Sequence, residues 1–392
     1  MQLEGIRVVD LSRMLSGPFC SMFLADMGAD VIKIEQPEHG DLLRHQGEAR
    51  NGLSLYFATY NRNKRSMTLS LRSEQGKEVL GRLIGAADVV VNNFRPGVMD
   101  AMGFGREALR RLKPDLVSCH ITGFGLDGPY AERPAFDFIA QAMSGFMSSN
   151  GEEGGPPMRA APPLSDLVAG AYAAMGILAA LVRRHRTGQG EEVAAALTDG
   201  MVSMLGFLAT NYFATGRLAP RTGNDHGMVA PYGLFDASDG KVAIAPSTEA
   251  LYDRLLVALG LERLREHPDL RTNEDRAGSR QAINGEINRR TRLHPMEHWV
   301  RTLNAAGVPC GRVLRVDEVF DDPQVRHQGM RVSIEDPTHG PIDVIGFPIK
   351  FTDEPCALRR PPPRLGADTD AILESLGYAE PAIVELRRKR VI

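Results

Sequence analysis

A carboxylate at the start of a long apolar helix is the strongest candidate for chemistry in this sequence. Asp166 lies in the run PLSDLVAGAYAAMGILAALVRRHRTG, which predicts a helix that ends in a group of cations before Gly188. The positive end of the helix dipole stabilises an ionised carboxylate, and an ionised carboxylate can act as a nucleophile. Ser and Asp before a helix are more often N-caps, and a capping carboxylate also stays ionised. Position alone does not separate the two interpretations.

Two polar clusters could contact an anionic ligand. The run Asn61-Arg62-Asn63-Lys64-Arg65-Ser66 suits phosphate oxygens, through its cations and its backbone N–H groups. A solvated charged turn is the alternative interpretation of that run. The run Asn92-Asn93-Phe94-Arg95-Pro96-Gly97 follows a predicted strand, where Phe94 and Arg95 could contact a nucleotide ring or phosphate. Asp137 is one acid in an otherwise apolar helical stretch, which makes it either a hydrogen-bonding hub or a site residue.

Several common kinds of site find no match in the sequence. The chain has no GxSxG, HExxH or HxH motif, and no Cys/His spacing that would hold a metal ion. The first predicted strand is followed by LSRMLSGPF, with one glycine in place of GxGxxG, which disfavours a dinucleotide cofactor. The absence of any CxxC pair argues against a disulfide framework and predicts a cytoplasmic location; the four cysteines are Cys20, Cys119, Cys310 and Cys356.

Strand and helix patterns alternate through the first third of the chain, which predicts an α/β domain with a parallel sheet covered by helices. Ligands of such sheets bind beyond the carboxyl ends of the strands. The expected strands are Ile6–Leu11, Val31–Glu35, Val89–Asn93 and Leu116–Thr122, and the expected helices are Phe19–Met27, Glu74–Ala87 and Arg106–Lys113. A further strand, Glu192–Leu197, and a helix, Gly200–Leu208, complete this region.

Length and composition shifts predict two domains. The 392 residues exceed the roughly 250–300 at which a single core stops growing. We expect a large domain over 1–215, a linker over 216–231, a smaller α+β domain over 232–327, and a segment 328–392 that returns to the large domain.

Charge and hydropathy exclude other classes of protein. The chain has 46 Lys and Arg against 49 Asp and Glu, a near balance that favours no nucleic-acid partner. The N-terminus lacks the basic and apolar regions of a signal peptide. The apolar stretch Leu167–Val182 is rich in Ala and Gly and falls short of the ~20 apolar residues of a membrane span, so we expect a buried helix and no membrane partner.

Long segments of the chain resemble the family III CoA-transferases, the CaiB/BaiF group. These segments are LSGPFCSMFLADMGADVIKIEQP, NRNKRSMTLSL, NNFRPGVMDAMGF, ITGFGLDGPYAERPAFDFIAQAMSG, LSDLVAGAYAAMGILAALVRRHRTGQG and PPRLGADTD. The resemblance implies a Rossmann-like large domain built from both chain ends and an interlocked homodimer. It also implies coenzyme A or an acyl-CoA as substrate, with no tightly bound cofactor. By position, Asp166 matches the nucleophilic aspartate of the family.

The resemblance also implies a set of CoA contacts. The matching positions are Leu15, Ser16, Gln36, Leu69 to Arg72, Asn93, Phe94, Arg95, Ala101, and Pro134 to Asp137, which includes Phe136. Gln36 and Ala101 stand where the formyl-CoA transferases carry arginines, so we expect Lys64, Arg65 or Arg72 to supply phosphate contacts. Leu15 replaces a glutamine, and the glycine-rich loop of those enzymes has no counterpart, so formyl-CoA and oxalate are not the expected substrates.

The resemblance leaves three interpretations of function. The first is transfer of CoA through a thioester on Asp166, with succinyl-CoA as donor and a small dicarboxylic acid as acceptor; Asn224 and His226 are candidate acceptor contacts. The second is a 2-methylacyl-CoA racemase, but racemases carry a His-Asp pair where this chain has Phe136-Asp137. The third is a CoA-binding protein without catalysis.

Overall fold

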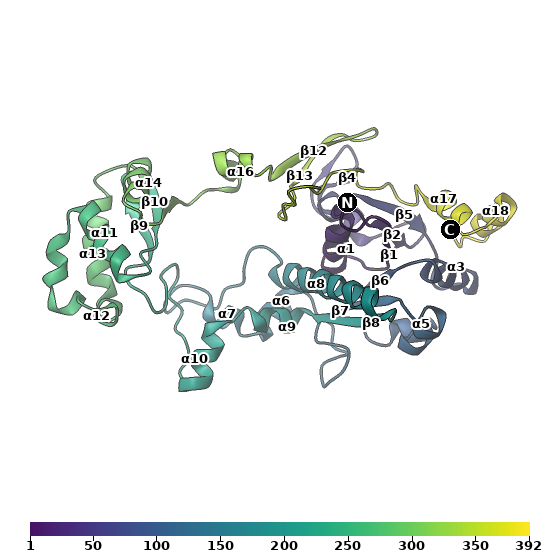
Figure 1. Cartoon of the computed structure of the whole chain (residues 1–392), viewed down its shortest axis with the longest axis horizontal. Coiled ribbons are helices and arrows are strands. Elements are labelled where there is room, and N and C mark those ends of the chain that lie inside the picture. Colours follow the sequence, from purple (N-terminus) through teal and green to yellow (C-terminus); the bar gives the residue numbers. More distant parts are fainter. The chain divides into compact units, whose positions relative to one another are not determined.

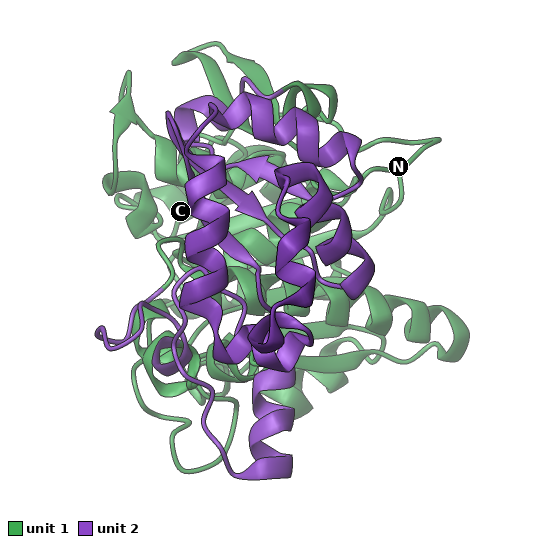
Figure 2. Cartoon of the chain, turned by 90° about the vertical axis from the view of Figure 1, so that its left-hand side faces the viewer, with its two compact units in different colours: residues 1–146, 160–206, 323–392 green, residues 147–159, 207–322 purple.

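The computed structural model describes residues 1–392 and divides into two compact units (Figure 1). The larger unit consists of residues 1–146, 160–206 and 323–392, and the smaller of residues 147–159 and 207–322; Figure 2 colours them green and purple. This division differs from the bounds expected from the sequence. The expected helix Gly200–Leu208 is two helices, α9 (Leu197–Ser203) and α10 (Phe207–Thr215), because the chain turns at Gly206 with φ of +51°. The second segment of the larger unit ends there, and α10 belongs to the smaller unit.

The larger unit is built on a parallel sheet, as the sequence predicts, but the sheet has six strands, of which β5 was not among those expected. The spatial order β5-β2-β1-β6-β7-β8 corresponds to 3-2-1-4-5-6 along the chain, which is the order of dinucleotide-binding Rossmann folds. Every neighbouring pair is parallel. The strands are β1 (Arg7–Asp10), β2 (Asp30–Glu35), β5 (Lys64–Thr68), β6 (Val89–Asn92), β7 (Val117–Thr122) and β8 (Glu191–Ala196).

Helices cover both faces of this sheet because its strands are apolar on both sides. In β1, Val8 packs with α1 (Ser16–Asp26) and α8 (Leu164–Thr187), while Val9 packs on the opposite face. The helices on that opposite face are α3 (Glu74–Gly85), α5 (Arg106–Leu112), α17 (Thr369–Ser375) and α18 (Glu380–Arg388). The last two come from the C-terminus, and Figure 1 shows α17 in yellow beside β5. Both chain ends therefore contribute to this core.

The segment around residue 64 is a strand and not the solvated turn considered above. Helix α2 (Leu55–Asn61) precedes it, and β5 pairs with β2 from Lys64 to Thr68. Alternate side chains of a strand point to opposite faces, so Lys64 enters the core while Arg65 lies on the other side of the sheet. The remaining elements of the larger unit are β3 (Ala49–Arg50), β4 (Leu53–Ser54), α4 (Val98–Ala101), α6 (Asp137–Met143), α16 (Pro323–His327), β12 (Arg331–Asp336) and β13 (Gly340–Ile345).

The smaller unit has its own core around an antiparallel sheet of order β11-β10-β9. Trp299 and Leu303 of α14 (Met296–Ala305) are buried in that core. The strands are β9 (Gly233–Ala237), β10 (Gly240–Ile244) and β11 (Cys310–Arg312), and the other helices are α11 (Glu249–Leu259), α12 (Asn273–Gly278), α13 (Arg280–Thr291) and α15 (Val316–Val319). Helix α7 (Phe146–Ser149) begins at the end of the first segment of the larger unit.

Helix α8 is long and apolar enough to cross a membrane by length and composition alone, which is weak evidence because core helices pass the same test. One side of the helix, with Ala169, Ala173 and Ile177, is buried in the core. Met175 and Val182 on the other side are 62% and 63% exposed. The expectation of a buried helix therefore holds for one face of α8.

Candidate active site

The order of the sheet places the candidate site beside β1 and β6. These neighbouring strands lead into connections on opposite sides of the sheet, and ligands of open α/β folds bind at such a switch point. The two loops are tied together by Asn93, whose side chain accepts a bond from Arg13 N at 2.8 Å and donates one to Arg13 O at 2.6 Å. Asn93 therefore fixes the backbone that presents the Arg13 side chain.

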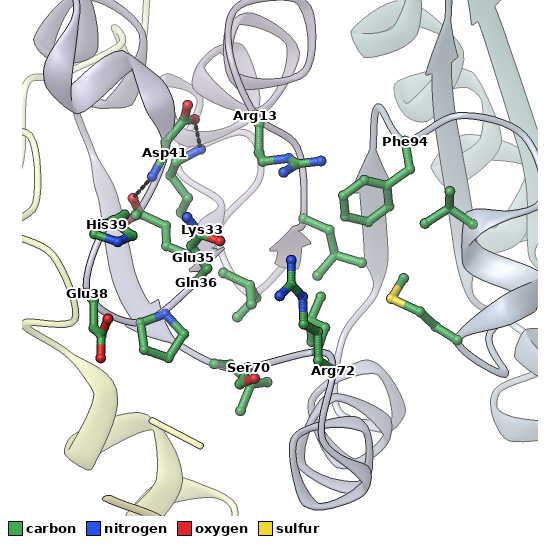
Figure 3. Close-up of a pocket in the computed structure, with 18 of the residues that line it drawn as sticks. Arg13, Lys33, Glu35, Gln36, Glu38, His39, Asp41, Ser70, Arg72 and Phe94 are labelled. Atoms are coloured by element: carbon green, nitrogen blue, oxygen red, sulfur yellow. Dashed lines mark hydrogen bonds and ion pairs between the residues drawn. The ribbon is translucent and has the colours of Figure 1, made fainter. Parts of the chain in front are cut away.

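A cavity of about 680 Å³ opens beside these loops (Figure 3). Figure 3 shows the guanidinium groups of Arg13 and Arg72 facing the same part of the cavity, near the ring of Phe94. The Arg13 guanidinium carbon is 5.3 Å from the centroid of that ring. Residues of the predicted CoA contacts that line this cavity are Gln36, Leu69, Arg72, Phe94 and Arg95. An aromatic ring among arginines is suited to a nucleotide with its phosphates.

A buried ion pair is part of the wall of this cavity. The fully buried Lys33 Nζ lies 2.8 Å from Asp41 Oδ2 and donates a bond to Ser12 O at 3.0 Å. Asp41 Oδ1 accepts a bond from Met14 N at 3.1 Å, which holds Met14 at its positive φ of 63°. These groups shape the loop after β1. Because Lys33 and Asp41 neutralise each other, neither is a free charge for a ligand.

A second cavity, of about 320 Å³, contains Asp166. It shares Arg13, Phe94 and Arg95 with the larger cavity, so the two adjoin at the loops after β1 and β6. Other residues of its wall are Met14, Ser16, Thr122, Gly123, Arg133 and Phe136. Asp166 is the one carboxylate or imidazole in this wall. The pair of cavities can therefore hold a long ligand with a phosphate end and a reacting end.

Asp166 lies inside the first turn of α8 and is not its N-cap. The N-cap position is Pro163, which provides no side-chain bond. Asp137 of α6 takes this role, because its Oδ1 accepts bonds from Ser165 N and Ser165 Oγ, each at 2.9 Å. Asp137 is 9% exposed and does not line either cavity. Of the two interpretations of Asp137, its contacts are those of a hydrogen-bonding hub.

Burial makes Asp166 harder to ionise than an ordinary aspartate. Loss of solvent, together with the smaller effect of the negative charge of Asp137, raises the pKa of its carboxyl from 3.8 to about 7, although a hydrogen bond from the Ser16 side chain opposes both effects. Tyr60 of α2 is affected by the same environment, since burial and the nearby charges of Tyr56 and Asp166 raise its pKa to about 12. The expectation of a capping carboxylate that is fully ionised is therefore corrected.

A glycine of α8 sets how closely the nucleophile approaches α1. A Cβ atom at Gly170 would lie 2.6 Å from Ser16 O, a distance that real Cβ atoms do not show. The close approach of the two helices brings Ser16 to Asp166. The Ala- and Gly-rich body of α8 thus serves both the packing of the core and the construction of the site.

Not all of the predicted site residues line the cavities. Lys64 is buried, with Nζ bonded to Asp10 Oδ2 at 3.2 Å and Pro18 O at 2.9 Å. Arg65 forms a bidentate pair with Asp30. Both cations therefore stabilise the fold, which corrects the expectation that they bind phosphate. Leu15, a buried residue, and Ala101 also lie outside the two cavity walls.

Three arginines of the walls were not predicted. Arg13 follows β1 at its carboxyl end, and that position was a signal that could have identified it. Arg133 comes from the segment before α6 and lies over the ring of Tyr130. Arg390 reaches the larger cavity from the C-terminus and has no local signal in the sequence.

The candidate acceptor contacts belong to the smaller unit. His226 Nδ1 accepts bonds from Met228 N and Val229 N at 3.1 and 3.2 Å, and its ring stacks on Phe207. Asn224 is exposed. Their role toward an acceptor stays a prediction.

Known proteins resemble this chain along nearly its whole length. The model of CoA-transferase family III matches residues 3–369. A human protein named succinyl-CoA:glutarate CoA-transferase is 35% identical over all of this chain and 90% of its own length. A succinate–glutarate CoA-transferase of Agrobacterium fabrum is 36% identical over 96% of each chain.

A solved structure shares the fold. The crystal structure of a CaiB/BaiF family protein from Brucella suis matches 95% of this chain and 99% of its own, with a TM-score of 0.84 and 38% identity. The family model, the relatives and the fold agree with one another. This chain belongs to CoA-transferase family III and is a CoA-transferase of that family.

Proposed function

We propose that the protein transfers CoA from succinyl-CoA to a small dicarboxylic acid of about the size of glutarate, through a thioester on Asp166. The observation that carries this proposal is a single ionisable carboxylate in a cavity that adjoins a larger, arginine-lined one. The names of the human and Agrobacterium relatives, which contain succinyl-CoA or succinate together with glutarate, support this pair of substrates.

The two cavities suggest how an acyl-CoA would lie. Its nucleotide end would occupy the larger cavity, with phosphates near Arg13 and Arg72 and the ring of Phe94 close by. The shared wall at Arg13 and Arg95 would guide the pantetheine chain toward Asp166. CoA is thus a substrate that enters and leaves, and the proposal requires no resident cofactor.

The reaction then needs only a carboxylate that is ionised and shielded from water. Ionised Asp166 attacks the thioester carbonyl of the donor, which forms a mixed anhydride and releases the CoA thiolate. The thiolate attacks the aspartyl carbonyl of the anhydride, which forms aspartyl-CoA thioester and releases succinate. The acceptor carboxylate attacks this thioester, and the thiolate returns to the acceptor carbonyl, which regenerates Asp166 and yields the new acyl-CoA. Water would hydrolyse each intermediate, so burial of Asp166 protects them.

The racemase interpretation has less support from the cavity wall. A racemase moves a proton between two faces of a carbon atom and needs an acid/base group on each side. Phe136 lines the smaller cavity and has no such group, and Asp166 is the one carboxylate or imidazole there. In the wall of this cavity, the second group is missing.

We also propose that the protein is a homodimer of interlocked subunits in the cytoplasm. Exposed apolar side chains support a self-association surface, since Met175 and Val182 of α8 are 62% and 63% exposed. In the smaller unit, Phe213 of α10 and Leu218 are 79% and 83% exposed. The free thiols of all four cysteines are consistent with a reducing compartment. Light scattering of the purified protein tests the dimer, and a monomer at micromolar concentration would contradict it.

An exchange assay tests the proposed reaction. The purified protein is incubated with succinyl-CoA and each of a panel of mono- and dicarboxylic acids, and new acyl-CoA is detected by mass spectrometry. Hydroxylamine treatment during turnover should modify Asp166. We expect Asp166→Asn to lose exchange, while Asp199→Asn, at an exposed aspartate in the first turn of α9, retains it. Equal exchange by the wild type and Asp166→Asn would refute the covalent mechanism.

A further inference from the structure

We propose that Asp137 is a positioning residue that holds the first turn of α8 and thereby sets the orientation and the charge of Asp166. This proposal rests on the proposed function and extends it to a residue that touches neither cavity. Asp137 acts through Ser165, the neighbour of Asp166 in the chain. Asp137 does not line either cavity, so its role follows from its contacts and not from the cavity walls.

The contacts of Asp137 fix the helix start from two directions. Its Oδ1 accepts bonds from both Ser165 N and Ser165 Oγ at 2.9 Å, which fixes the backbone and the rotamer of that residue. Gln141 Nε2, one turn further along α6, donates to both carboxylate oxygens, at 3.0 and 2.8 Å. Gln141 Oε1 accepts a bond from Ala160 N at 2.8 Å, where the chain re-enters the larger unit. Every polar atom of this buried network is therefore used.

The network leaves little freedom at the first turn of α8. Asp137, Gln141 and Ser165 are 9%, 0% and 0% exposed, so no water can replace a lost bond without a rearrangement. Ser165 immediately precedes Asp166, and a rotation of this turn would move the Asp166 carboxylate relative to its cavity. Displacement of a reacting group by about 1 Å can cost about a hundredfold in rate.

Asp137 also contributes a negative charge close to the nucleophile. This charge makes Asp166 harder to ionise, in addition to the larger effect of burial. The other groups that face Asp166 are Ser16 of α1, the tyrosines Tyr56 and Tyr60 of α2, and the arginines Arg13, Arg95 and Arg133 of the cavity wall. None of these groups is a carboxylate, so Asp137 is the one other carboxylate that acts on Asp166. Its substitution therefore has an electrostatic consequence that a purely structural residue lacks.

Two substitutions at residue 137 separate position from charge. Asp137→Asn keeps the size of the side chain and removes its charge. Its amide group then faces the Gln141 amide donor, so Gln141 must turn and lose the bond from Ala160 N. Asp137→Glu keeps the charge and displaces the carboxylate by one methylene. Ser165→Ala is the matched control, because it removes one hydroxyl bond and leaves both the charge and the Ser165 N bond in place.

The readout is the pH dependence of succinyl-CoA exchange. We expect kcat to fall by about tenfold to a hundredfold in both Asp137 variants. The acid limb of the pH profile, centred near pH 7 in the wild type, should move to lower pH in Asp137→Asn alone. Ser165→Ala should lower kcat less and keep the wild-type midpoint. Unchanged kcat in Asp137→Glu and Ser165→Ala would overturn the positioning role, even where Asp137→Asn fails to fold. An unchanged midpoint in Asp137→Asn would overturn the role of the charge.

A measurement without turnover distinguishes failure of this inference from failure of the proposed function. Asp166→Asn removes the buried charge of residue 166 and should raise the urea midpoint of unfolding above pH 7 in the wild-type background. In the Asp137→Asn background, this increase should be smaller, because the repulsion between the two carboxylates is already absent. Equal increases in both backgrounds would overturn the inference, whether or not the protein exchanges CoA.

Discussion

Removal of the Asp166 charge is expected to stabilise the folded protein while it abolishes exchange. The folded protein binds a proton at Asp166 with a pKa of about 7, whereas the unfolded chain does so with a pKa near the usual 3.8. Between these values the folded state holds the proton more tightly, so the free energy of unfolding of the wild type decreases as pH rises from about 4 to 7 and then becomes constant. The side chain of the Asp166→Asn variant cannot ionise, so its free energy of unfolding does not show this decrease with pH.

The size of the effect follows from the interval between the two pKa values. At about 1.4 kcal/mol per pH unit, the interval from 3.8 to about 7 amounts to about 4 kcal/mol as an upper limit. Asp166 is half-buried in the free protein, and screening at its exposed part reduces the expected gain to about 2 kcal/mol. Below pH 4, where the carboxyl is protonated in both states, the gain should vanish.

Urea unfolding at 25 °C, repeated from pH 4 to pH 8.5, measures this difference. Circular dichroism reports both units, whereas the fluorescence of Trp299, the one tryptophan of the chain, reports the smaller unit. Asp166→Asn should therefore alter the circular dichroism transition of the larger unit, and Asp199→Asn should show no pH-dependent gain. A less stable Asp166→Asn variant, or a gain that is the same at pH 4.5 and pH 8, would refute the inference that a costly charge is held in the cavity.

Three further predictions concern activity and packing. The kcat/KM for succinyl-CoA should fall about tenfold per pH unit below pH 7, because the free enzyme must ionise Asp166 before attack; a flat profile from pH 5.5 to 8 would contradict the role of that carboxylate. Gly170→Ala should lower the free energy of unfolding by about 1–3 kcal/mol in urea titrations and reduce kcat, because its Cβ would meet Ser16 O at 2.6 Å, whereas Gly85→Ala, with open space around it, should be neutral. Arg72→Ala should raise the KM for succinyl-CoA by about tenfold with little change in kcat, and Arg111→Ala, exposed and outside the cavity, should leave KM as in the wild type; equal KM values in the two variants would exclude Arg72 from nucleotide binding.

The sequence allowed prediction of those parts of the structure that depend on local patterns. The apolar runs of β1, β2, β6 and β7 and the helical spacing of α3 identified these elements to within about three residues of their bounds. Asp166 was identified because it begins a long periodic segment, and the resemblance to a family gave it a role.

The errors arise where a residue's environment is set by distant parts of the chain. Lys64 belongs to a short strand whose alternation of charged and polar residues resembles a loop, and its partner Asp10 lies 54 residues away. The cap of α8 could not be predicted either, because Asp137 reaches Ser165 across 28 residues. Arg390 reaches the larger cavity only because Val391 is buried and its carbonyl accepts a bond from Ser70 N.

The packing of α8 explains why a sheet with the Rossmann order does not require a glycine-rich phosphate loop here. In dinucleotide-binding folds the pyrophosphate lies at the N-terminus of the first helix. In this protein one side of the N-terminal turn of α1 packs against α8, since Gly170 brings the two backbones together at Ser16. Ser16 of this turn lines the cavity that contains Asp166, and the negative charge of that carboxylate disfavours a phosphate group there. Anion binding must then rely on side chains around the switch point, and Arg13, Arg72 and Arg95 line the cavity there. The helix start that holds phosphate in other Rossmann folds has become, in this chain, a wall of the cavity that contains Asp166.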